Sequence, residues 1–338
     1  MPLKPIPVDS LVQLLDRCDT FYPGQGYTGA VPEDRTVGHF VVDGRRVGHV
    51  RASLVQAVRE HMASSETPVF LLEPSTFPGT DGHEDAAAAA DVHLSSAIPA
   101  TYEARTGAIK QVIDGWRASD RLKPLRGGTE ATLSVERSAS ALFGMATFGV
   151  HINILTPTAS SSTTSASGMV PDAGAWKMWI ARRSLQKPTY PGMLDNSVAG
   201  GIPYGLSPRE AMIKECEEEA SLPAHLAEKA VCTGCVSYIN DTVNGVQPEV
   251  QYVYDLILPP SVTLCPNDGE VECFYLWDAT QLREALMSGA FKPNCALVIL
   301  DFLLRHGLIT PELDPAYLSF GPRLHRTLGL YGPGGTRI

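Results

Sequence analysis

Long apolar runs are missing from this sequence, and positive charge is scarce. No apolar run approaches the roughly 20 residues that a membrane-spanning helix needs, and the opening stretch MPLKPIPVDSL lacks the apolar core of a signal peptide. Lysine and arginine number 27 against 37 acidic residues, and the net charge of −10 argues against nucleic acid as a partner. We therefore expect a cytoplasmic protein, or one from another reducing compartment, with neither a membrane nor a nucleic-acid partner.

Cysteine is scarce as well. Seven cysteines in 338 residues without a secretion signal do not indicate a disulfide framework. Cys232 and Cys235 have the spacing of half a metal knuckle, but no second pair of this kind accompanies them, so we interpret both as structural thiols in a strand. His151 lies in the apolar run FGVHINIL and is interpreted as a strand histidine with satisfied hydrogen bonds rather than as a catalyst.

The sequence does contain a short acidic segment, residues 200–223, which reads GGIPYGLSPREAMIKECEEEASLP. Ser207 is a favourable N-cap, Pro208 suits the first helical position, and Glu210 completes a capping box. Pro223 marks the end of the segment, because proline cannot continue a helix. These residues predict a helix over residues 207–221.

In that helix Glu215, Glu218 and Glu219 share one face. Like charges at this spacing repel by about 0.2–0.5 kcal/mol per pair, so the cluster does not stabilise the helix by itself. Carboxylates of this kind hold Mg²⁺ together with substrate phosphates, and the cluster therefore predicts a Mg²⁺ site, with Mn²⁺ as the alternative ion. An ordinary acidic surface helix is the competing interpretation. Glu217 falls on another face, where we expect it to pair with Lys214 in solvent.

The segment resembles the signature of the Nudix hydrolases, which runs from a glycine through a first glutamate to Arg-Glu-apolar-x-Glu-Glu-x-Gly-apolar. Gly200 and Gly201 match the glycine start, residues 214–219 match the charged core, and Leu222 matches the last apolar position. The three glutamates that bind metal in the family are kept. The resemblance implies a loop-helix-loop that binds Mg²⁺.

The match is imperfect in the loop and at three residues. The loop is one residue shorter than the pattern, and Leu206, Lys214 and Ser221 stand where the signature has Glu, Arg and Gly. In typical members the first Glu and the Arg interact, so both partners have changed together here. Glu210 lies one turn before Lys214 and is the expected substitute partner at i, i+4.

The segments around the signature resemble the Nudix subgroup labelled thiamine pyrophosphokinase-related. They are WKMWIARRSLQKPTYPGMLDNSVAGG before it, and GCVSYIN, PEVQYVYDL, DGEVECFYLW and FKPNCALVILDFLLRHG after it. That subgroup carries an extra N-terminal domain, which LLDRCDTFYP and VGHFVVDGRRVGHVRASLVQAV resemble. The resemblance implies hydrolysis of thiamine diphosphate or its oxidised analogues, not kinase activity.

Several side chains are candidates for roles at such a site. Under the resemblance, a carboxylate from a later loop acts as ligand or base, and Glu270 and Glu272 lie in the right segment. The alternative is solvated charge at a strand edge. The candidates for contacts with substrate phosphates are Arg182, Arg183 and Lys187, with solvated loop cations as the alternative. The candidates for stacking on a heteroaromatic ring are Tyr190, Tyr238 and Trp179, of which we expect Trp179 to pack in the core.

Three functions remain open from the sequence. The first is a diphosphohydrolase acting on thiamine diphosphate-like compounds, and the second is a Nudix hydrolase acting on another organic diphosphate, such as a prenyl or biosynthetic diphosphate. The third is a ligand binder without catalysis, which the three departures from the signature motivate. In each case the expected partner is a small-molecule diphosphate.

The predicted fold is α/β, with a Nudix α/β/α sandwich following a smaller N-terminal α/β domain. We expect the domains to span residues 1–130 and 131–310, with a C-terminal extension over 311–338. Residues 74–92 are expected to form a flexible or partly helical insertion, and residues 156–174 a disordered loop. The predicted helices, beside the one over 207–221, cover residues 8–20, 52–63, 278–288 and 294–306. The predicted strands lie within residues 40–50, as a hairpin around Asp43-Gly44, and within 141–155, 176–183, 236–240, 251–258 and 272–277.

Overall fold

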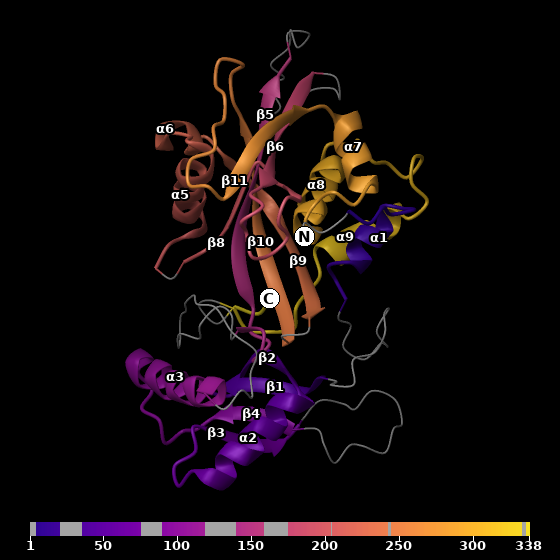
Figure 1. The fold of residues 1–338 in the computed structure, drawn as a ribbon. Helices are drawn as coiled ribbons and strands as arrows, with labels where there is room; N and C mark the ends of the chain where they lie inside the picture. The colour runs from indigo at the N-terminus through magenta and orange to yellow at the C-terminus, as the bar shows by residue number, and fades with distance from the viewer. Residues whose placement is uncertain are drawn as a thin grey trace. The chain divides into compact units, whose positions relative to one another are not determined.

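A computed structural model describes most of the chain. The described residues are 5–20, 36–75, 90–118, 140–158, 175–203, 205–242, 245–332 and 336–338. The chain divides into two compact units, each an α/β structure (Figure 1). The first unit comprises residues 1–18, 148–238 and 250–326, and the second comprises residues 19–147, 239–249 and 327–338. None of the helices in the described residues is long and apolar enough to cross a membrane.

The second unit contains a four-stranded sheet in the order β2-β1-β4-β3. Its strands are β1 (Thr36–Val42), β2 (Arg45–Arg51), β3 (Phe70–Pro74) and β4 (Ala90–Leu94), and its helices are α2 (Ala52–Ser64) and α3 (Tyr102–Ala118). β1 and β2 form the predicted antiparallel hairpin, and both turn residues, Asp43 and Gly44, have positive φ. Phe40, Phe70 and Trp116 pack in the core of this unit.

The prediction of an insertion over residues 74–92 is wrong at its C-terminal end. β4 begins at Ala90 and pairs with β1 in parallel and with β3 in antiparallel orientation. Val92 is fully buried in the core between these neighbours. Strand pairing on both sides stabilises this short segment, which its local sequence could not indicate. The rest of the predicted insertion, residues 76–89, lies outside the described residues.

The first unit is built on a seven-stranded sheet with the path β11-β6-β5-β10-β9, beside which β7 pairs with β6 and β8 with β5. Its strands are β5 (Thr147–Pro157), β6 (Trp176–Arg183), β7 (Leu194–Asp195), β8 (Val198–Gly201), β9 (Val231–Thr242), β10 (Gly245–Ile257) and β11 (Val271–Trp277). The strands predicted in this part of the sequence are confirmed, except that the one predicted over residues 141–155 begins only at Thr147, since residues 141–144 form a turn and Phe143 packs in the core of the second unit. Residues 159–174, which include most of the predicted loop, lie outside the described part of the chain.

Helices cover both faces of this sheet, as Figure 1 shows. On one face lie α5 (Pro208–Ala220) and α6 (Ala224–Ala227), and on the other lie α1 (Val12–Asp16), α7 (Ala279–Met287), α8 (Pro293–Arg305) and α9 (Tyr317–Leu324). The strands alternate accordingly, because Trp176, Met178 and Ile180 of β6 pack in the core beneath α8, whereas Trp179 packs in the core beneath α5. The predicted α/β/α sandwich is therefore confirmed.

The helix predicted over residues 8–20 is shorter, since α1 covers only Val12–Asp16. At its C-terminal end the chain pairs with β9 instead. Thr20 N donates to Ile239 O at 3.0 Å, and Ile239 N donates to Asp19 Oδ1 at 3.0 Å. These contacts with a residue distant in sequence end the helix.

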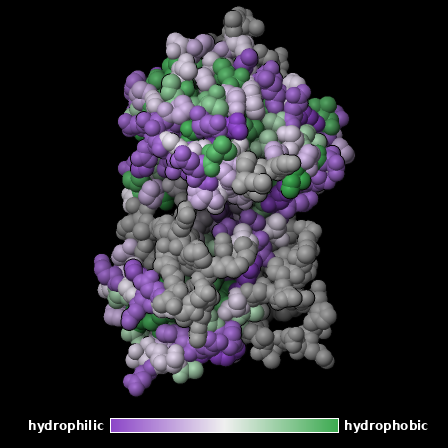
Figure 2. Space-filling view, viewed as in Figure 1, coloured by the Kyte–Doolittle hydropathy of each residue, from purple (hydrophilic) through white to green (hydrophobic). Residues whose placement is uncertain are grey.

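On the face drawn in Figure 2, hydrophilic residues are interspersed with apolar ones over the described part of the first unit.

Candidate metal and diphosphate site

Helix α5 begins and faces the core as its sequence predicts. The side chain of Ser207 accepts a hydrogen bond from Glu210 N, and Glu210 Oε2 accepts one from Ser207 N at 2.8 Å, which completes the capping box. Met212 and Cys216 are buried in the core between the helix and the sheet. Glu219 lies on the same buried face and is only 8% exposed.

The backbone of β8 receives two of the three predicted metal ligands. Ala199 N donates a hydrogen bond to Glu219 Oε2 at 3.0 Å. Gly200 faces Glu215 so closely that a Cβ atom at position 200 would overlap the carboxyl group of Glu215. Gly201 continues the strand and pairs with Gly149 of β5. The glycine start of the signature therefore has a physical role here, because it lets the helix bring Glu215 against the strand.

The carboxyl group of Glu219 is held where its negative charge is disfavoured. Burial raises its pKa well above the usual value, and the negative charges of Asp195, Glu215 and Glu270 raise it further. The hydrogen bond from Ala199 N opposes this effect without cancelling it.

Glu215 lies in a similar environment. Burial raises its pKa, the charge of Lys214 opposes this, and the charges of Glu218, Glu270 and Asp268 add to the increase. Glu270 thus acts on both Glu215 and Glu219 from the residue that precedes β11. A divalent cation among these carboxylates would offset their mutual repulsion, and oxygen donors of this type suit Mg²⁺.

Glu218 is exposed and forms an ion pair with Lys214 one turn earlier. The predicted pair between Lys214 and Glu217 is therefore wrong, as is the suggestion that Glu210 replaces the partner of Lys214. The long lysine side chain reaches the carboxylate at i+4, and the carboxylate of Glu210 bonds to Ser207 instead. The ligand oxygens of the three glutamates do not form a group within 4.8 Å of one another in the described part of the structure.

The basic candidates each contact an acidic side chain. Arg183 is buried, and its Nη1 donates to Asp195 Oδ2 at 2.7 Å. Its other donors reach the carbonyl oxygens of Thr189 and Tyr190 at 3.0 and 3.2 Å. The structure therefore makes Arg183 a link between β7 and the loop 184–193, and does not present it to a substrate phosphate.

The two remaining cations pair with the two candidate carboxylates of the later segment. Arg182 Nε lies 3.3 Å from Glu272 Oε2, and Lys187 pairs with Glu270. Both pairs are partly exposed. The structure thus pairs Lys187 with Glu270, whose charge acts on Glu215 and Glu219, whereas it pairs Glu272 with Arg182.

The aromatic candidates separate into core and loop positions. Tyr238 is 2% exposed, accepts a hydrogen bond from Gln251 Nε2 at 3.0 Å, and packs in the core on the α8 side of the sheet, opposite α5. Trp179 is buried as expected and donates to Thr156 Oγ1 at 3.0 Å. Tyr190 is half-buried in the loop after β6, with φ of +50°. Of these residues, Tyr190 is the one in a loop near the basic side chains.

A buried polar cluster that sequence reasoning did not find lies beside this site. His151 of β5, Asp195 of β7 and Cys295 of α8 have ligand atoms within 4.8 Å of one another. Cys295 Sγ donates to Asp195 Oδ1 at 2.7 Å, and His151 Nδ1 lies 2.7 Å from Asn196 Oδ1. The expectation that His151 is a hydrogen-bonded strand histidine is confirmed. No local motif signals the cluster, because its residues come from three separate elements.

This cluster does not suit a metal ion. Burial, together with the charge of Lys292, lowers the pKa of His151 to about 4, against the opposing charge of Asp195. Burial alone would raise the pKa of Asp195, but the charges of Lys292 and Arg183 and the hydrogen bond from Cys295 outweigh it and hold the pKa at about 2. Two cationic side chains already compensate the carboxylate, so we interpret the cluster as a structural network.

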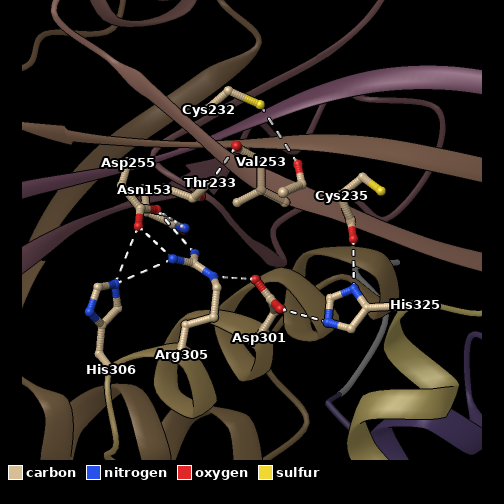
Figure 3. Close-up of polar contacts among 11 residues, drawn as sticks. Asn153, Cys232, Thr233, Cys235, Val253, Asp255, Asp301, Arg305, His306 and His325 are labelled. Carbon is tan, nitrogen blue, oxygen red and sulfur yellow. Dashed lines mark hydrogen bonds and ion pairs between the residues drawn. The ribbon is translucent and has the colours of Figure 1, made fainter. Parts of the chain in front are cut away.

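A second polar network lies on the α8 side of the sheet (Figure 3). Arg305 Nη1 donates to Asp255 Oδ2 at 2.8 Å, and Arg305 Nε donates to Asp301 Oδ2 at 2.7 Å. His325, which follows α9, places Nε2 3.2 Å from Asp301 Oδ1 and Nδ1 2.8 Å from Cys235 O. Cys235 is exposed on β9, as is Cys232, and all seven cysteines of the chain are free thiols.

Comparison with known proteins identifies the two parts of the chain. Residues 163–293 match the family model described as the NUDIX domain, and residues 11–147 match the model described as a domain of unknown function, DUF4743. The chain therefore contains a Nudix domain preceded by a DUF4743 domain. The predicted combination of a Nudix domain with an extra N-terminal domain is confirmed.

Two curated relatives and one solved structure illustrate the similarity. The uncharacterized protein YJR142W of Saccharomyces cerevisiae is 42% identical over 208 residues, which are 57% of this chain and 57% of that protein. Nudix hydrolase 20, chloroplastic, of Arabidopsis thaliana is 40% identical over 218 residues, which are 64% of this chain and 54% of that protein. The chain thus spans just over half the length of these relatives. The structure of DR0079 from Deinococcus radiodurans aligns with a TM-score of 0.36 and 20% identity over 52% of this chain and 97% of that one.

Proposed function

We propose that this protein is a Mg²⁺-dependent Nudix hydrolase that cleaves an organic diphosphate, with Mn²⁺ as an alternative ion. The observation that carries the proposal is the position of Glu215 and Glu219 against the backbone of β8, where a glycine makes room for one carboxylate and an N–H group orients the other. Burial is the largest cause of their raised pKa values, and neighbouring negative charges that lack compensation add to it. A bound divalent ion would supply that compensation, neutralise charge on phosphate oxygens and lower the pKa of an attacking water.

The protein's own carboxylates would bind this ion. Glu215, Glu218 and Glu219 would hold the ion, and Glu218 would leave Lys214 to do so. Glu270 is the better candidate for the further carboxylate, because its charge acts on Glu215 and Glu219, whereas Glu272 pairs with Arg182.

Substrate contacts are proposed for the loop after β6 and for the signature glycines. Lys187 and Arg182 would contact the phosphates, and Tyr190 would stack on the organic group. Gly200 and Gly201 would line the diphosphate site, with the space beside Gly200 taken by the carboxyl group of Glu215.

The proposed substrate is thiamine diphosphate or one of its oxidised analogues. This choice rests on the resemblance of the flanking segments to the thiamine pyrophosphokinase-related subgroup. A thiazolium-pyrimidine group is cationic, so a protein of net charge −10 repels it less than it repels a nucleotide triphosphate. The name of the Arabidopsis relative, a Nudix hydrolase, supports hydrolysis rather than binding alone.

We further propose the domain limits 1–130, 131–310 and 311–338, and location in the cytoplasm or another reducing compartment. The free state of all seven thiols supports a reducing environment.

Phosphate release from a panel of compounds tests the substrate. The panel contains thiamine diphosphate, an oxidised thiamine diphosphate, a prenyl diphosphate and nucleotides, each with and without Mg²⁺. We expect Mg²⁺-dependent turnover of a thiamine compound with the highest kcat/KM. Turnover of the prenyl compound alone would move the assignment to another organic diphosphate, and no turnover of any compound would favour a binder.

Glutamate variants test the metal site. Glu218→Gln and Glu219→Gln should each keep the fold, lose most activity and weaken Mn²⁺ binding measured by titration calorimetry. Glu217→Gln is the matched control, since this neighbour lies on the exposed side of α5 and should cost little in rate. Near wild-type turnover of both ligand variants at saturating Mg²⁺ would contradict the metal assignment.

A further inference from the structure

Lys187 and Glu270 form an ion pair whose position is fixed by the backbone on both sides. Ser184 N donates to Glu270 O at 2.8 Å, and Lys187 N donates to Ser184 O at 3.2 Å. Glu270 N donates to Asp268 Oδ1 at 2.8 Å. The Lys187 side chain is 21% exposed and that of Glu270 is 49% exposed. The two short turns therefore bring the ammonium and the carboxylate together at an accessible position.

Glu270 has two kinds of neighbour. On one side its carboxylate contacts Lys187. On the other side the segment that precedes it is hydrogen-bonded to α5, since Asn267 Nδ2 donates to Glu217 O and Cys265 N donates to Ala220 O, each at 3.2 Å, and the charge of Glu270 acts on Glu215 and Glu219 of that helix. As long as Lys187 is bound, part of the charge of Glu270 is neutralised and one of its oxygens is engaged. If Lys187 leaves, the whole carboxylate becomes available to a cation near Glu215 and Glu219.

We propose that Lys187 exchanges partners when a diphosphate binds, so that it leaves Glu270 for a phosphate oxygen and releases Glu270 to the metal site. This inference rests on the function proposed above. The exchange replaces one ion pair by another and needs no proton transfer or covalent step. A partly exposed ion pair contributes about 1 kcal/mol or less, so a multiply charged phosphate can compete for the lysine. Lysine suits such an exchange, because its ammonium group is compact and its stem is flexible.

A neighbouring ion pair provides a matched control. Arg182 lies in β6 and Glu272 in β11, the two strands next to the tested pair, and Arg182 Nε lies 3.3 Å from Glu272 Oε2. Their side chains are 38% and 42% exposed, which is comparable to the pair under test. Glu270 precedes β11 and follows the segment that is hydrogen-bonded to α5, whereas Glu272 lies within β11.

The test measures Mn²⁺ affinity of the full-length protein without any diphosphate, and separately the KM for the diphosphate that it turns over. Lys187→Met should tighten Mn²⁺ binding by about two- to five-fold, because Glu270 is released. The same variant should raise KM by about ten-fold, because a charged phosphate contact is lost. Arg182→Met should leave the Mn²⁺ affinity within about two-fold of the wild type.

A double variant separates release of Glu270 from a general loss of positive charge. In a Glu270→Gln background, Lys187→Met should leave the Mn²⁺ affinity unchanged. An equal gain in both backgrounds, a weaker Mn²⁺ affinity in Lys187→Met, or an unchanged KM would each overturn the exchange while leaving the proposed hydrolase intact. Absence of Mn²⁺ binding to the wild-type protein would overturn the proposed function and the exchange together.

Discussion

Asp195 offers the most direct test of how charge is arranged next to the carboxylate cluster. It lies in β7 and is 7% exposed, and its oxygens accept from Arg183 Nη1 and Cys295 Sγ, each at 2.7 Å. Its pKa falls from 3.8 to about 2, because the charges of Lys292 and Arg183 outweigh burial. At 1.36 kcal/mol per pH unit, this difference corresponds to about 2 kcal/mol of stability at neutral pH. Since the folded pKa is the lower one, that stability is present above pH 3.8 and is lost as the pH falls through about 2.

Replacing Asp195 by Asn removes the charge and keeps the shape. The guanidinium of Arg183 then stays buried without its counter-charge, so we expect a loss of about 3–5 kcal/mol in the free energy of unfolding. Urea denaturation of metal-free protein near pH 7 measures the loss. Asp268→Asn, at an exposed position, is the control. A loss below about 1 kcal/mol would refute the reasoning.

Two further predictions concern the end of α5 and the network on α8. Ser221 ends α5 with φ of +53° in the left-handed region, so Ser221→Gly should raise the free energy of unfolding by about 0.5–1 kcal/mol in thermal denaturation, while Ser221→Ala should not; a lower Tm for the glycine variant would count against this. Both ring nitrogens of His325 face oxygen acceptors, and the hydrogen bond to Asp301 raises its pKa above 6.5. The stability from His325 should therefore be full below pH 6.5 and disappear as the pH rises through the folded pKa, whereas His325→Gln should not show this dependence; an NMR titration with a pKa of 6.5 or lower would contradict it.

The elements that could be predicted from the sequence are those whose hydrogen bonds are local. Ser207 and Glu210 bond to each other within one turn, so the start of α5 is readable from four residues. The Asp43-Gly44 turn is likewise predictable from its own two residues, because Asp-Gly is a preferred pair where both turn residues have positive φ. β4 depends on pairing with β1 and β3, and the end of α1 depends on β9. The local sequence could therefore predict neither β4 nor the end of α1.

The candidate site likewise contains features that the local sequence predicted and contacts that it did not. Helical spacing and the signature placed Glu215 and Glu219 on one side of α5, and the glycine at position 200 on the strand that receives them. The ion-pair partner of Lys214 was wrong, because an angular projection of the helix does not show how far a lysine side chain reaches along it. The role of Arg183 depends on Asp195, a residue of another strand. No spacing rule within one segment can indicate such a contact.

The departures from the signature can be understood together once these contacts are known. Leu206, in place of the first glutamate, is half-buried and packs against the core beneath α5. Lys214, in place of the arginine, pairs with Glu218 instead of with that missing glutamate. An apolar contact and an ion pair within the helix thus replace one ion pair between loop and helix, and neither change touches the contacts of Glu215 and Glu219 with β8. These departures therefore give little support to a non-catalytic binder, because the contacts of Glu215 and Glu219 with β8 do not depend on the residues that changed, and of the three proposed ligands Glu218 alone pairs with a changed residue, Lys214.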